Sequence, residues 1–532
     1  MHAPKSALGL VLLATSSIYA CGAADSAGTF GDEAPSGTAD AATGPGGNGG
    51  ASAVDAGPPP EKEIESSFQA PVATGNFVWV ANPASGRVAY IDAKTLEVKV
   101  AFAGNGPTQI AALPSTGAGS GDATVVLNAL SHDATLLRAK DGVLERKTFA
   151  VGDDANKWSV SKDGRWAIAW SDATLVPGAA KSRGFQDLTV IDVTGALPPQ
   201  ILSVGYRPTA VGFDGAAKLA YAVTEDGVAL LELSPAGGAA PRLVRNVPLG
   251  SDGPGAATAR DVSVTPDLRF AFVRRTGDAK VGVVPLDGVG AAVDVTLDGP
   301  VTDLDLAEDG SKAVAVVRET GKVFVLPVPA IATKPLEFAS LPITGETVGS
   351  VSLAPAGDRG LLYTTATPVE RLSVLSLAPA LSFRALRLYA PVAAVFPAPA
   401  AANAVVLHTT GSDGLGAFSL VPVADTLPAK IVQMNAPPFA VSVRDDLAIV
   451  AERNDTTRVY GAWIARFPSF RTEHFPLASA PLAVGVVPSA GRAFVSQMHP
   501  EGRITFFDLA TGAARTLTGF ELASRVVTGG TP

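Results

Sequence analysis

The chain has 532 residues, of which 47% are hydrophobic, 17% charged and 6% aromatic. Its 55 glycines and 41 prolines favour frequent turns and argue against an architecture of long helices. The formal net charge of −9 leaves no basic surplus for polyphosphate, so we expect no nucleic-acid partner. A single cysteine, Cys21, excludes an intrachain disulfide framework, a cysteine-rich zinc site and a protein-ligated iron–sulfur cluster.

Residues 1–20 have the pattern of a targeting segment. Lys5 supplies a short basic region, and the apolar run from Ala7 to Ala14 is too short to span a bilayer as a stable helix. The sequence that follows, Ile18-Tyr19-Ala20-Cys21-Gly22, resembles the bacterial lipobox, in which an aliphatic and a small residue precede the cysteine. The resemblance implies that Cys21 becomes the lipidated N-terminus of the mature protein, anchored in a membrane by three acyl chains.

The alternative is an ordinary signal peptide that is cut near Ala23, with Cys21 discarded. The lipoprotein interpretation is favoured because the one cysteine of the chain stands where the lipobox needs it. Gly22 occupies the position at which retention in the inner membrane would usually require Asp. We therefore expect a lipid-anchored protein of the bacterial cell envelope, at the outer rather than the inner membrane.

Residues 21–67 have the composition of a disordered tether. They are mostly Gly, Ala, Ser, Pro, Asp and Thr, and they contain eight acidic residues but only one lysine, Lys62. Such a segment cannot bury enough apolar surface to offset the entropy lost on ordering. The sequence predicts a solvated acidic spacer between the membrane and a folded domain at 68–532.

The folded domain is built from a strand repeat. Segment 76–114 contains four short apolar or β-branched runs, at 76–82, 87–92, 97–103 and 107–114, separated by Pro, Gly, Asn and Ser. The pattern VWVAN…GRVAYIDAKTLEV…GNGPTQIAALP resembles the YVTN-type β-propeller repeat. The resemblance implies an all-β, WD40-like propeller of four-stranded antiparallel blades.

One apolar position in the fourth run recurs along the chain and sets the period. The steps between its occurrences are 42 to 53 residues and average about 47, in the range of propeller blades. The marked residues are Ile110, Trp158, Val211, Val262, Leu304, Val351, Val395, Val441 and Val484. The domain therefore holds about ten repeats, and we expect one large ring because no internal linker resembles the tether. Two five-bladed rings and an eight-bladed ring stay open as alternatives.

The two ends of the domain predict how the ring closes. Segment 522–527 echoes segment 482–487, which opens the last complete repeat, whereas the first repeat has only a weak opening strand at 68–74. We expect the C-terminal strand near 524–528 to pair with the strand near 77–81 and so remove an exposed edge.

The sequence offers little chemistry. The histidines form no HExxH or HxH pair, and no GxSxG or P-loop motif is present, so we assign no catalytic residue and expect no redox cofactor or structural metal. The most suggestive polar set lies on the strands expected to line the axial channel: Lys157, Asp261, Asp303 and Asp305. It is either a polar or cation-binding site, with a weak Ca²⁺ at Asp303 and Asp305, or the polar inner end of the blades.

These observations leave two classes of function. The favoured one is a monomeric, non-catalytic platform that binds an unknown protein or small molecule at a propeller face or in the channel. The alternative is a propeller enzyme similar to lactonases or quinoprotein dehydrogenases. The alternative lacks the His and acid clusters of a metal-dependent lactonase and the vicinal cysteines of some quinoproteins. Fold analogy alone supplies no activity.

Overall fold

The chain forms a ring of β-sheets. In the computed structural model, the described residues are 71–114, 122–140, 142–172, 186–250, 260–424, 426–499 and 502–519. They make ten four-stranded antiparallel sheets, each with its strands in chain order. The expected targeting segment 1–20 and tether 21–67 lie outside the described residues.

We call the sheets blades 1 to 10. Blades 1 to 5 contain, in order, β1 (Val72–Ala73), β2 (Phe77–Asn82), β3 (Arg87–Asp92) and β4 (Val98–Phe102); β5 (Pro107–Leu113), β6 (Asp122–Asn128), β7 (Asp133–Lys140) and β8 (Val143–Ala150); β9 (Lys157–Val160), β10 (Trp166–Trp170), β11 (Asp187–Asp192) and β12 (Gln200–Ser203); β13 (Ala210–Phe213), β14 (Leu219–Val223), β15 (Gly227–Glu232) and β16 (Arg242–Pro248); and β17 (Arg260–Val264), β18 (Phe270–Arg275), β19 (Lys280–Pro285) and β20 (Val293–Thr296).

Blades 6 to 10 follow the same plan. They contain β21 (Asp303–Leu306), β22 (Lys312–Val317), β23 (Lys322–Pro327) and β24 (Ala339–Pro342); β25 (Ser350–Leu353), β26 (Arg359–Tyr363), β27 (Arg371–Ser376) and β28 (Ser382–Arg387); β29 (Val392–Pro397), β30 (Asn403–His408), β31 (Ala417–Pro422) and β32 (Lys430–Gln433); β33 (Pro438–Val443), β34 (Leu447–Asn454), β35 (Val459–Arg466) and β36 (Arg471–Pro476); and β37 (Pro481–Val487), β38 (Arg492–Gln497), β39 (Arg503–Asp508) and β40 (Ala514–Thr518).

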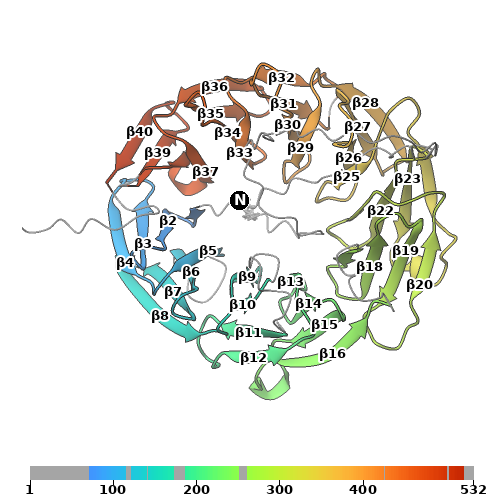
Figure 1. Cartoon of the computed structure of the whole chain (residues 1–532), viewed down its shortest axis with the longest axis horizontal. Helices are drawn as coiled ribbons and strands as arrows, with labels where there is room; N and C mark the ends of the chain where they lie inside the picture. The colour runs from blue at the N-terminus through green and yellow to red at the C-terminus, as the bar shows by residue number, and fades with distance from the viewer. Residues whose placement is uncertain are drawn as a thin grey trace, which may run out of the picture.

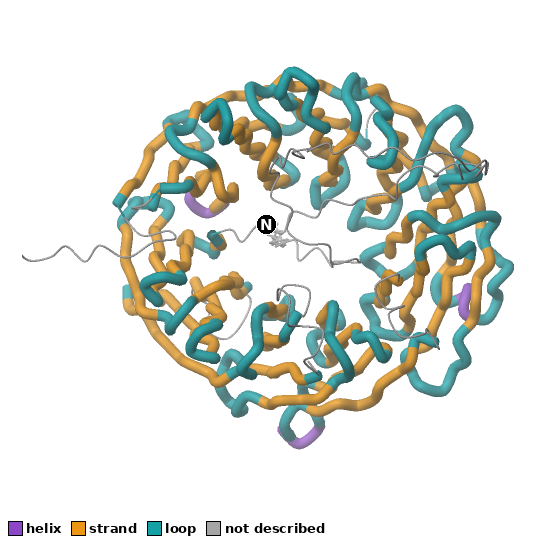
Figure 2. Tube along the Cα trace, in the orientation of Figure 1, coloured by secondary structure: helices purple, strands orange, loops and turns teal. Residues whose placement is uncertain are grey.

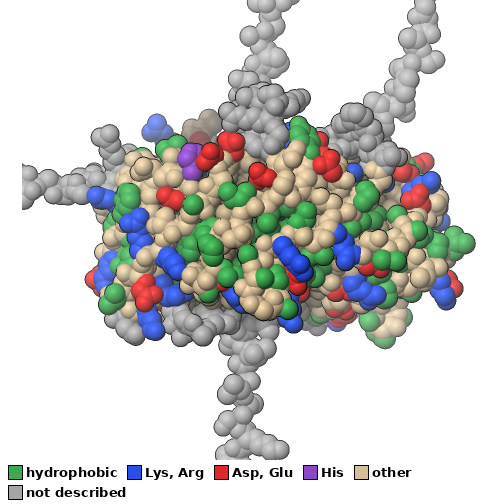
Figure 3. Space-filling model, turned by 90° about the horizontal axis from the view of Figure 1, so that it is seen from below, with side chains coloured by type: hydrophobic (Ala, Val, Ile, Leu, Met, Phe, Trp, Pro, Cys, Tyr) green, Lys and Arg blue, Asp and Glu red, His purple; other side chains and the backbone are tan. Residues whose placement is uncertain are grey.

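The blades stand around one central axis, so the chain is a single ten-bladed β-propeller (Figure 1). The first strand of each blade lies nearest the axis and the fourth lies at the rim, with loops between them (Figure 2). Each marked residue, from Ile110 to Val484, lies on the first strand of its blade, which confirms the predicted period. Seen edge-on, the ring is a disc with acidic and basic side chains interspersed on its rim (Figure 3).

Helix is almost absent from the described residues. Three single 3₁₀ turns occur there, η3 (Ala236–Gly238), η5 (Ala330–Ala332) and η6 (Pro488–Ala490). In the same part of the chain, no helix has the length and apolar character needed to cross a membrane.

The hydrophobic core is divided among the interfaces between blades. In β10, Trp166, Ile168 and Trp170 pack toward blade 4, while Ala167 and Ala169 pack toward blade 2. Because successive side chains of a strand point to opposite faces, a strand buried on both faces must be apolar throughout. This explains the run WAIAW, in which every residue is buried.

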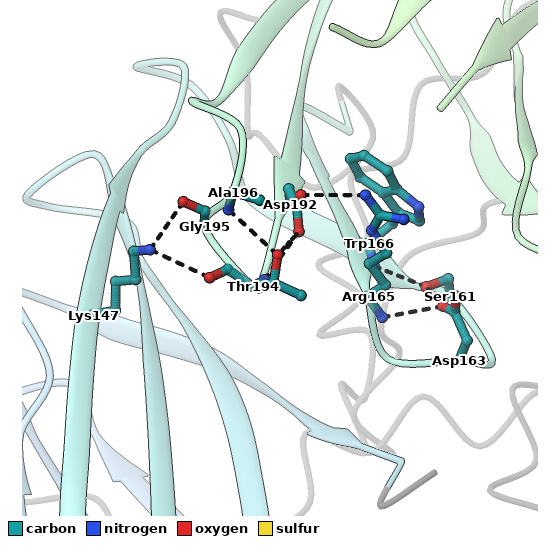
Figure 4. Close-up of polar contacts among 9 residues, drawn as sticks. All are labelled: Lys147, Ser161, Asp163, Arg165, Trp166, Asp192, Thr194, Gly195 and Ala196. Atoms are coloured by element: carbon teal, nitrogen blue, oxygen red, sulfur yellow. Dashed lines mark hydrogen bonds and ion pairs between the residues drawn. The ribbon is translucent and has the colours of Figure 1, made fainter. Parts of the chain in front are cut away.

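Short polar turns join the first and second strands. After β9, Ser161 donates its hydroxyl to Asp163 Oδ1 at 2.5 Å and accepts a bond from the Trp166 N–H at 2.9 Å (Figure 4). The turn after β17 repeats this arrangement, with Thr265 bonded to Asp267 Oδ1 at 2.6 Å. Side chains that bond their own turn backbone fix its conformation, so these residues have a local structural role.

The ring does not close in the predicted way. β1 pairs with β2, Val72 opposite Trp79 and Ala73 opposite Val78. The weak opening strand at 68–74 therefore contributes β1, which takes the place beside β2 that we had expected a strand near 524–528 to take. The predicted pairing is wrong at Val78 and Trp79. Residues 520–532 lie outside the described residues.

Closure instead uses the packing that joins other blades. Val78 and Ile91 of blade 1 share one buried cluster with Phe494, Ile504 and Phe506 of blade 10. The first and last blades thus meet face to face, and no strand is exchanged between them in the described residues.

Candidate functional site

The predicted carboxylate pair joins two blades. Asp303 Oδ2 accepts a hydrogen bond from the Val351 N–H at 2.7 Å, and Asp305 Oδ2 accepts one from the Leu353 N–H at 2.7 Å. The other oxygen of each carboxyl accepts the N–H of the following residue, Leu304 or Leu306, at 2.8 Å. The two acids of β21 therefore accept hydrogen bonds from two backbone N–H groups of β25, the first strand of the next blade.

This position changes the acidity of Asp305. Burial raises the pKa of Asp305 to about 7, against the Leu353 N–H, which lowers it, while the neighbouring Asp303 raises it further. A low-dielectric environment disfavours the charged form of a carboxyl, and a second carboxylate nearby acts in the same direction. The protonation of Asp305 therefore changes near neutral pH.

The other two residues of the predicted site have partners of their own. Asp261 on β17 pairs with Arg274 on the adjacent strand β18. Lys157 on β9 lies 3.2 Å from Asp172, and its ammonium stands 5.2 Å from the centroid of the Trp170 ring. Of the four predicted residues, the structure brings Asp303 and Asp305 together on one strand. In the described part of the chain, no group of three or more His, Cys, Asp or Glu side chains could hold a metal ion, so Asp261 does not complete such a group with them.

Other polar residues of the inner strands make the same kind of contact. Ser159 donates to the Val211 carbonyl at 2.8 Å, Gln109 donates to the Asn156 carbonyl at 2.7 Å, and the Thr302 hydroxyl donates to the Gly349 carbonyl at 2.7 Å. Each bond runs from one blade to the next. These three polar residues, like Asp303 and Asp305, therefore connect neighbouring blades, whereas Asp261 and Lys157 pair within their own blades.

Two histidines have defined partners. His408, buried in blade 8, donates from Nδ1 to the Pro391 carbonyl at 3.1 Å and accepts at Nε2 from the Ser419 hydroxyl at 2.7 Å. Burial lowers the pKa of His408 to about 4, although the backbone carbonyls beside it act in the opposite direction. His474 bonds the fully buried Glu452 at 2.7 Å. Both rings are held in place by these contacts.

Two cavities lie away from the inner strands. One, of about 420 Å³, is lined by Glu370, Arg371 and Arg387 on the outer half of blade 7. The other, of about 260 Å³, lies between the outer strands of blade 2 and the turn that follows β11 in blade 3. We call it the rim cavity, and its lining residues are Leu136, Arg138, Glu145, Arg146, Lys147, Val193 and Thr194.

Neither cavity was predicted from the sequence. Each contains two or more arginine or lysine residues, which an alternating outer strand presents as ordinary solvent-exposed charges. The signal that could have identified the rim cavity is the turn Asp192-Val193-Thr194-Gly195, whose aspartate and glycine mark a tight connection.

Comparison with known proteins identifies no family. No protein-family model matches the chain. No curated protein matches it either.

Solved structures resemble it at low sequence identity. A eukaryotic initiation factor structure is 11% identical over 76% of this chain and 96% of its own, with a TM-score of 0.49. Apo AztD from Citrobacter koseri is 12% identical over 76% and 96%, with a TM-score of 0.39. The dihydro-heme d1 dehydrogenase NirN in complex with DHE is 13% identical over 78% and 77%, with a TM-score of 0.38. Because these likenesses are weak, the chain's own strand pairing is what identifies it as a ten-bladed β-propeller.

Proposed function

We propose that this protein is a non-catalytic binding platform of the bacterial cell envelope. The observation that carries the proposal is the use of Asp303 and Asp305, the most promising acids of the sequence, as acceptors for backbone donors of the next blade. Side chains used in this way make the ring a scaffold. This structural use of the two acids favours a binding role over chemistry at the axis. The ligands of such a scaffold bind at its surfaces and in the cavities between its blades.

Membrane attachment is part of the proposal. Lipid on Cys21 anchors the chain, and the acidic tether at 21–67 holds the propeller away from the membrane as a monomer. The support is the lipobox-like sequence that ends at Cys21, and Gly22 favours the outer membrane.

The anchor is tested by membrane fractionation of cells that express the full chain. Cys21→Ser should move the protein from the membrane fraction to the soluble fraction and abolish incorporation of labelled fatty acid. Ala23→Ser, two residues further on, is the matched control and should leave both unchanged. Retention of Cys21→Ser in the membrane with undiminished label would refute the anchor.

The non-catalytic role is tested on the purified protein by elemental analysis and absorbance spectroscopy. We expect no stoichiometric zinc, iron or quinone. A stoichiometric metal or quinone that survives purification would instead favour the lactonase-like or quinoprotein-like alternative. Weakly held calcium is a separate outcome, and Asp303→Asn with Asp305→Asn should remove it if it binds at that pair.

A further inference from the structure

We propose that the rim cavity between blades 2 and 3 binds a carboxylate. This inference rests on the proposed binding role, for which it names a class of ligand. The inference does not depend on membrane attachment. The cavity lies where β7 and β8 run side by side, with Leu136 opposite Lys147 and Arg138 opposite Glu145. These four side chains share the face of blade 2 that packs toward blade 3.

The wall contributed by blade 3 is held rigid. Asp192, whose side chain is fully buried, accepts bonds at Oδ1 from the Thr194 N–H at 3.0 Å and the Thr194 hydroxyl at 2.6 Å. Arg165 approaches its other oxygen at 3.6 Å from the opposite side (Figure 4). Gly195 closes the turn in the left-handed region, at a φ of 71°. A turn fixed in this way presents its carbonyl oxygens at constant positions.

Lys147 spans the two blades at this wall. Its ammonium donates to the carbonyl oxygens of Thr194 at 3.4 Å and Gly195 at 3.2 Å (Figure 4). Both acceptors are neutral carbonyl groups. They hold the Lys147 ammonium at the mouth of the cavity and do not neutralise its positive charge.

Arg138 adds a second positive charge with an unused donor. Its Nη1 lies 3.8 Å from Glu145 Oε2, and the Glu145 side chain is 60% exposed, so this ion pair is loose. The Arg138 Nε is buried and has no hydrogen-bond partner among the described residues. An unsatisfied buried donor is unfavourable, and a ligand that lets the guanidinium turn and bond through this edge removes that cost.

These groups match a carboxylate that carries a short apolar chain. The planar guanidinium can donate two parallel bonds to the two oxygens of a carboxylate, and the nearby ammonium adds a point charge. The buried side chains of Leu136 and Val193 line the same cavity and can pack against a short aliphatic chain. The ligand is a small carboxylic acid or the acidic side chain of a peptide, and a binding experiment separates the two sources.

The chain supplies a matched control. Arg242 lies on β16, the outer strand of blade 4, away from the rim cavity, and its guanidinium donates to Glu232 Oε2 from Nε at 2.9 Å and from Nη2 at 2.8 Å. Arg138→Gln and Arg242→Gln therefore change the net charge equally, and only the first alters a residue that lines the cavity.

The test measures the binding of glutarate, of a blocked Glu-Glu dipeptide and of inorganic phosphate to the full-length protein. Ligand-observed NMR detects the binding and shows whether it saturates. We expect glutarate to bind if the ligand is a small carboxylic acid, and the dipeptide to bind if it is the acidic side chain of a peptide. Phosphate should bind at least tenfold more weakly than the carboxylate that binds. Arg138→Gln should weaken carboxylate binding at least tenfold and Lys147→Gln at least threefold, and Lys147→Arg, which keeps the positive charge, should bind more tightly than Lys147→Gln. Arg242→Gln should stay within twofold of the wild type.

If Arg138→Gln does not fold, as judged by its melting curve, the exposed Glu145→Gln is the second variant. It removes the acid that competes for Arg138 and should tighten carboxylate binding severalfold; unchanged or weaker binding contradicts the site. The proposal is overturned if neither carboxylate binds, if Arg242→Gln weakens binding as much as Arg138→Gln, or if phosphate binds equally well. Loss of carboxylate binding in Arg387→Gln alone would move the site to blade 7 and leave the general binding role intact.

Discussion

Arg492 in the last blade donates from Nη1 to the carbonyl oxygen of Ala93 in the first blade, at 2.8 Å. Arg466 makes the corresponding contact between blades 9 and 10, where its Nη2 donates to the Leu509 carbonyl at 2.5 Å. In both cases the acceptor follows the aspartate that ends the third strand of its blade. The interface that closes the ring is therefore of the same kind as an interior one.

This equivalence predicts the effect of mutations on the two sides of β38 and β39. Phe494 belongs to the closing interface and Phe507 to the interface between blades 9 and 10, and both are buried. Phe494→Ala and Phe507→Ala should each lower the free energy of unfolding by about 3–5 kcal/mol, the usual cost of emptying a buried phenylalanine site. Denaturant titration of both variants checks this. A negligible effect of Phe494→Ala beside a large effect of Phe507→Ala would mean that the ring is held closed by other contacts.

The acids of β21 should matter for stability. Asp303→Ala leaves the buried Val351 N–H without its acceptor, and we expect a loss of about 1–3 kcal/mol in the free energy of unfolding. Asp294→Ala is the control, since the ion pair of Asp294 with Lys280 at 3.5 Å is exposed and its loss should cost less than about 1 kcal/mol. Denaturant titration compares the two variants, and equal losses would contradict a bridging role for Asp303.

Asp305 predicts a pH dependence of stability. Because its pKa is raised from 3.8 to about 7, the folded protein binds this proton more tightly than the unfolded chain. Its contribution to stability is full below about pH 4 and is lost as the pH rises toward 7. The melting temperature of the wild type relative to Asp305→Asn should therefore fall as the pH rises from about 4.5 to about 8. Parallel melting curves across this range would show that Asp305 does not titrate there.

His408 should resist protonation. Its pKa of about 4 means that the imidazole stays neutral at about pH 5.5 in the folded protein, whereas in the unfolded chain it should titrate near the ordinary value of 6.5. Stability is then lost as the pH falls from 6.5 toward 4. Imidazole resonances followed by NMR, with and without denaturant, check this. A folded-state transition above about pH 6 would contradict the buried, doubly bonded geometry.

Gly195 is predicted to tolerate a side chain about as well as other glycines of positive φ. A Cβ at this position would overlap the ammonium group of Lys147. Gly277 has a similar positive φ of 79° but nothing within 4 Å of its Cβ position, so it is the matched control for backbone strain alone. Because the end of the Lys147 side chain can move aside, Gly195→Ala should lower the melting temperature by about as much as Gly277→Ala does, and a much larger drop would show that Lys147 cannot leave the turn.

Sequence patterns located the strands well and their contacts poorly. The run 87–92 predicted β3 without error because its mostly apolar residues, three of them buried, are bounded by turn residues. The spacing of Asp303 and Asp305 placed both carboxyls on one face, but it could not show what they bind. Their partners are the backbone N–H groups of Val351 and Leu353, which every residue except proline has and which leave no mark in a sequence. The sequence indicated only a weak strand at β1 because two residues are too few to show an alternation of apolar and polar side chains.

The shortness of β1 affects how the ring would respond to mechanical force. A pull applied at residue 71 acts first on β1, whose two residues pair only with Val78 and Trp79. The contacts that close the ring, from Arg492 to Ala93 and within the Phe494 cluster, are made chiefly by β2, β3 and the turn after β3. Tension would therefore peel away β1 first, before it reaches β2 and the contacts that join blade 1 to blade 10.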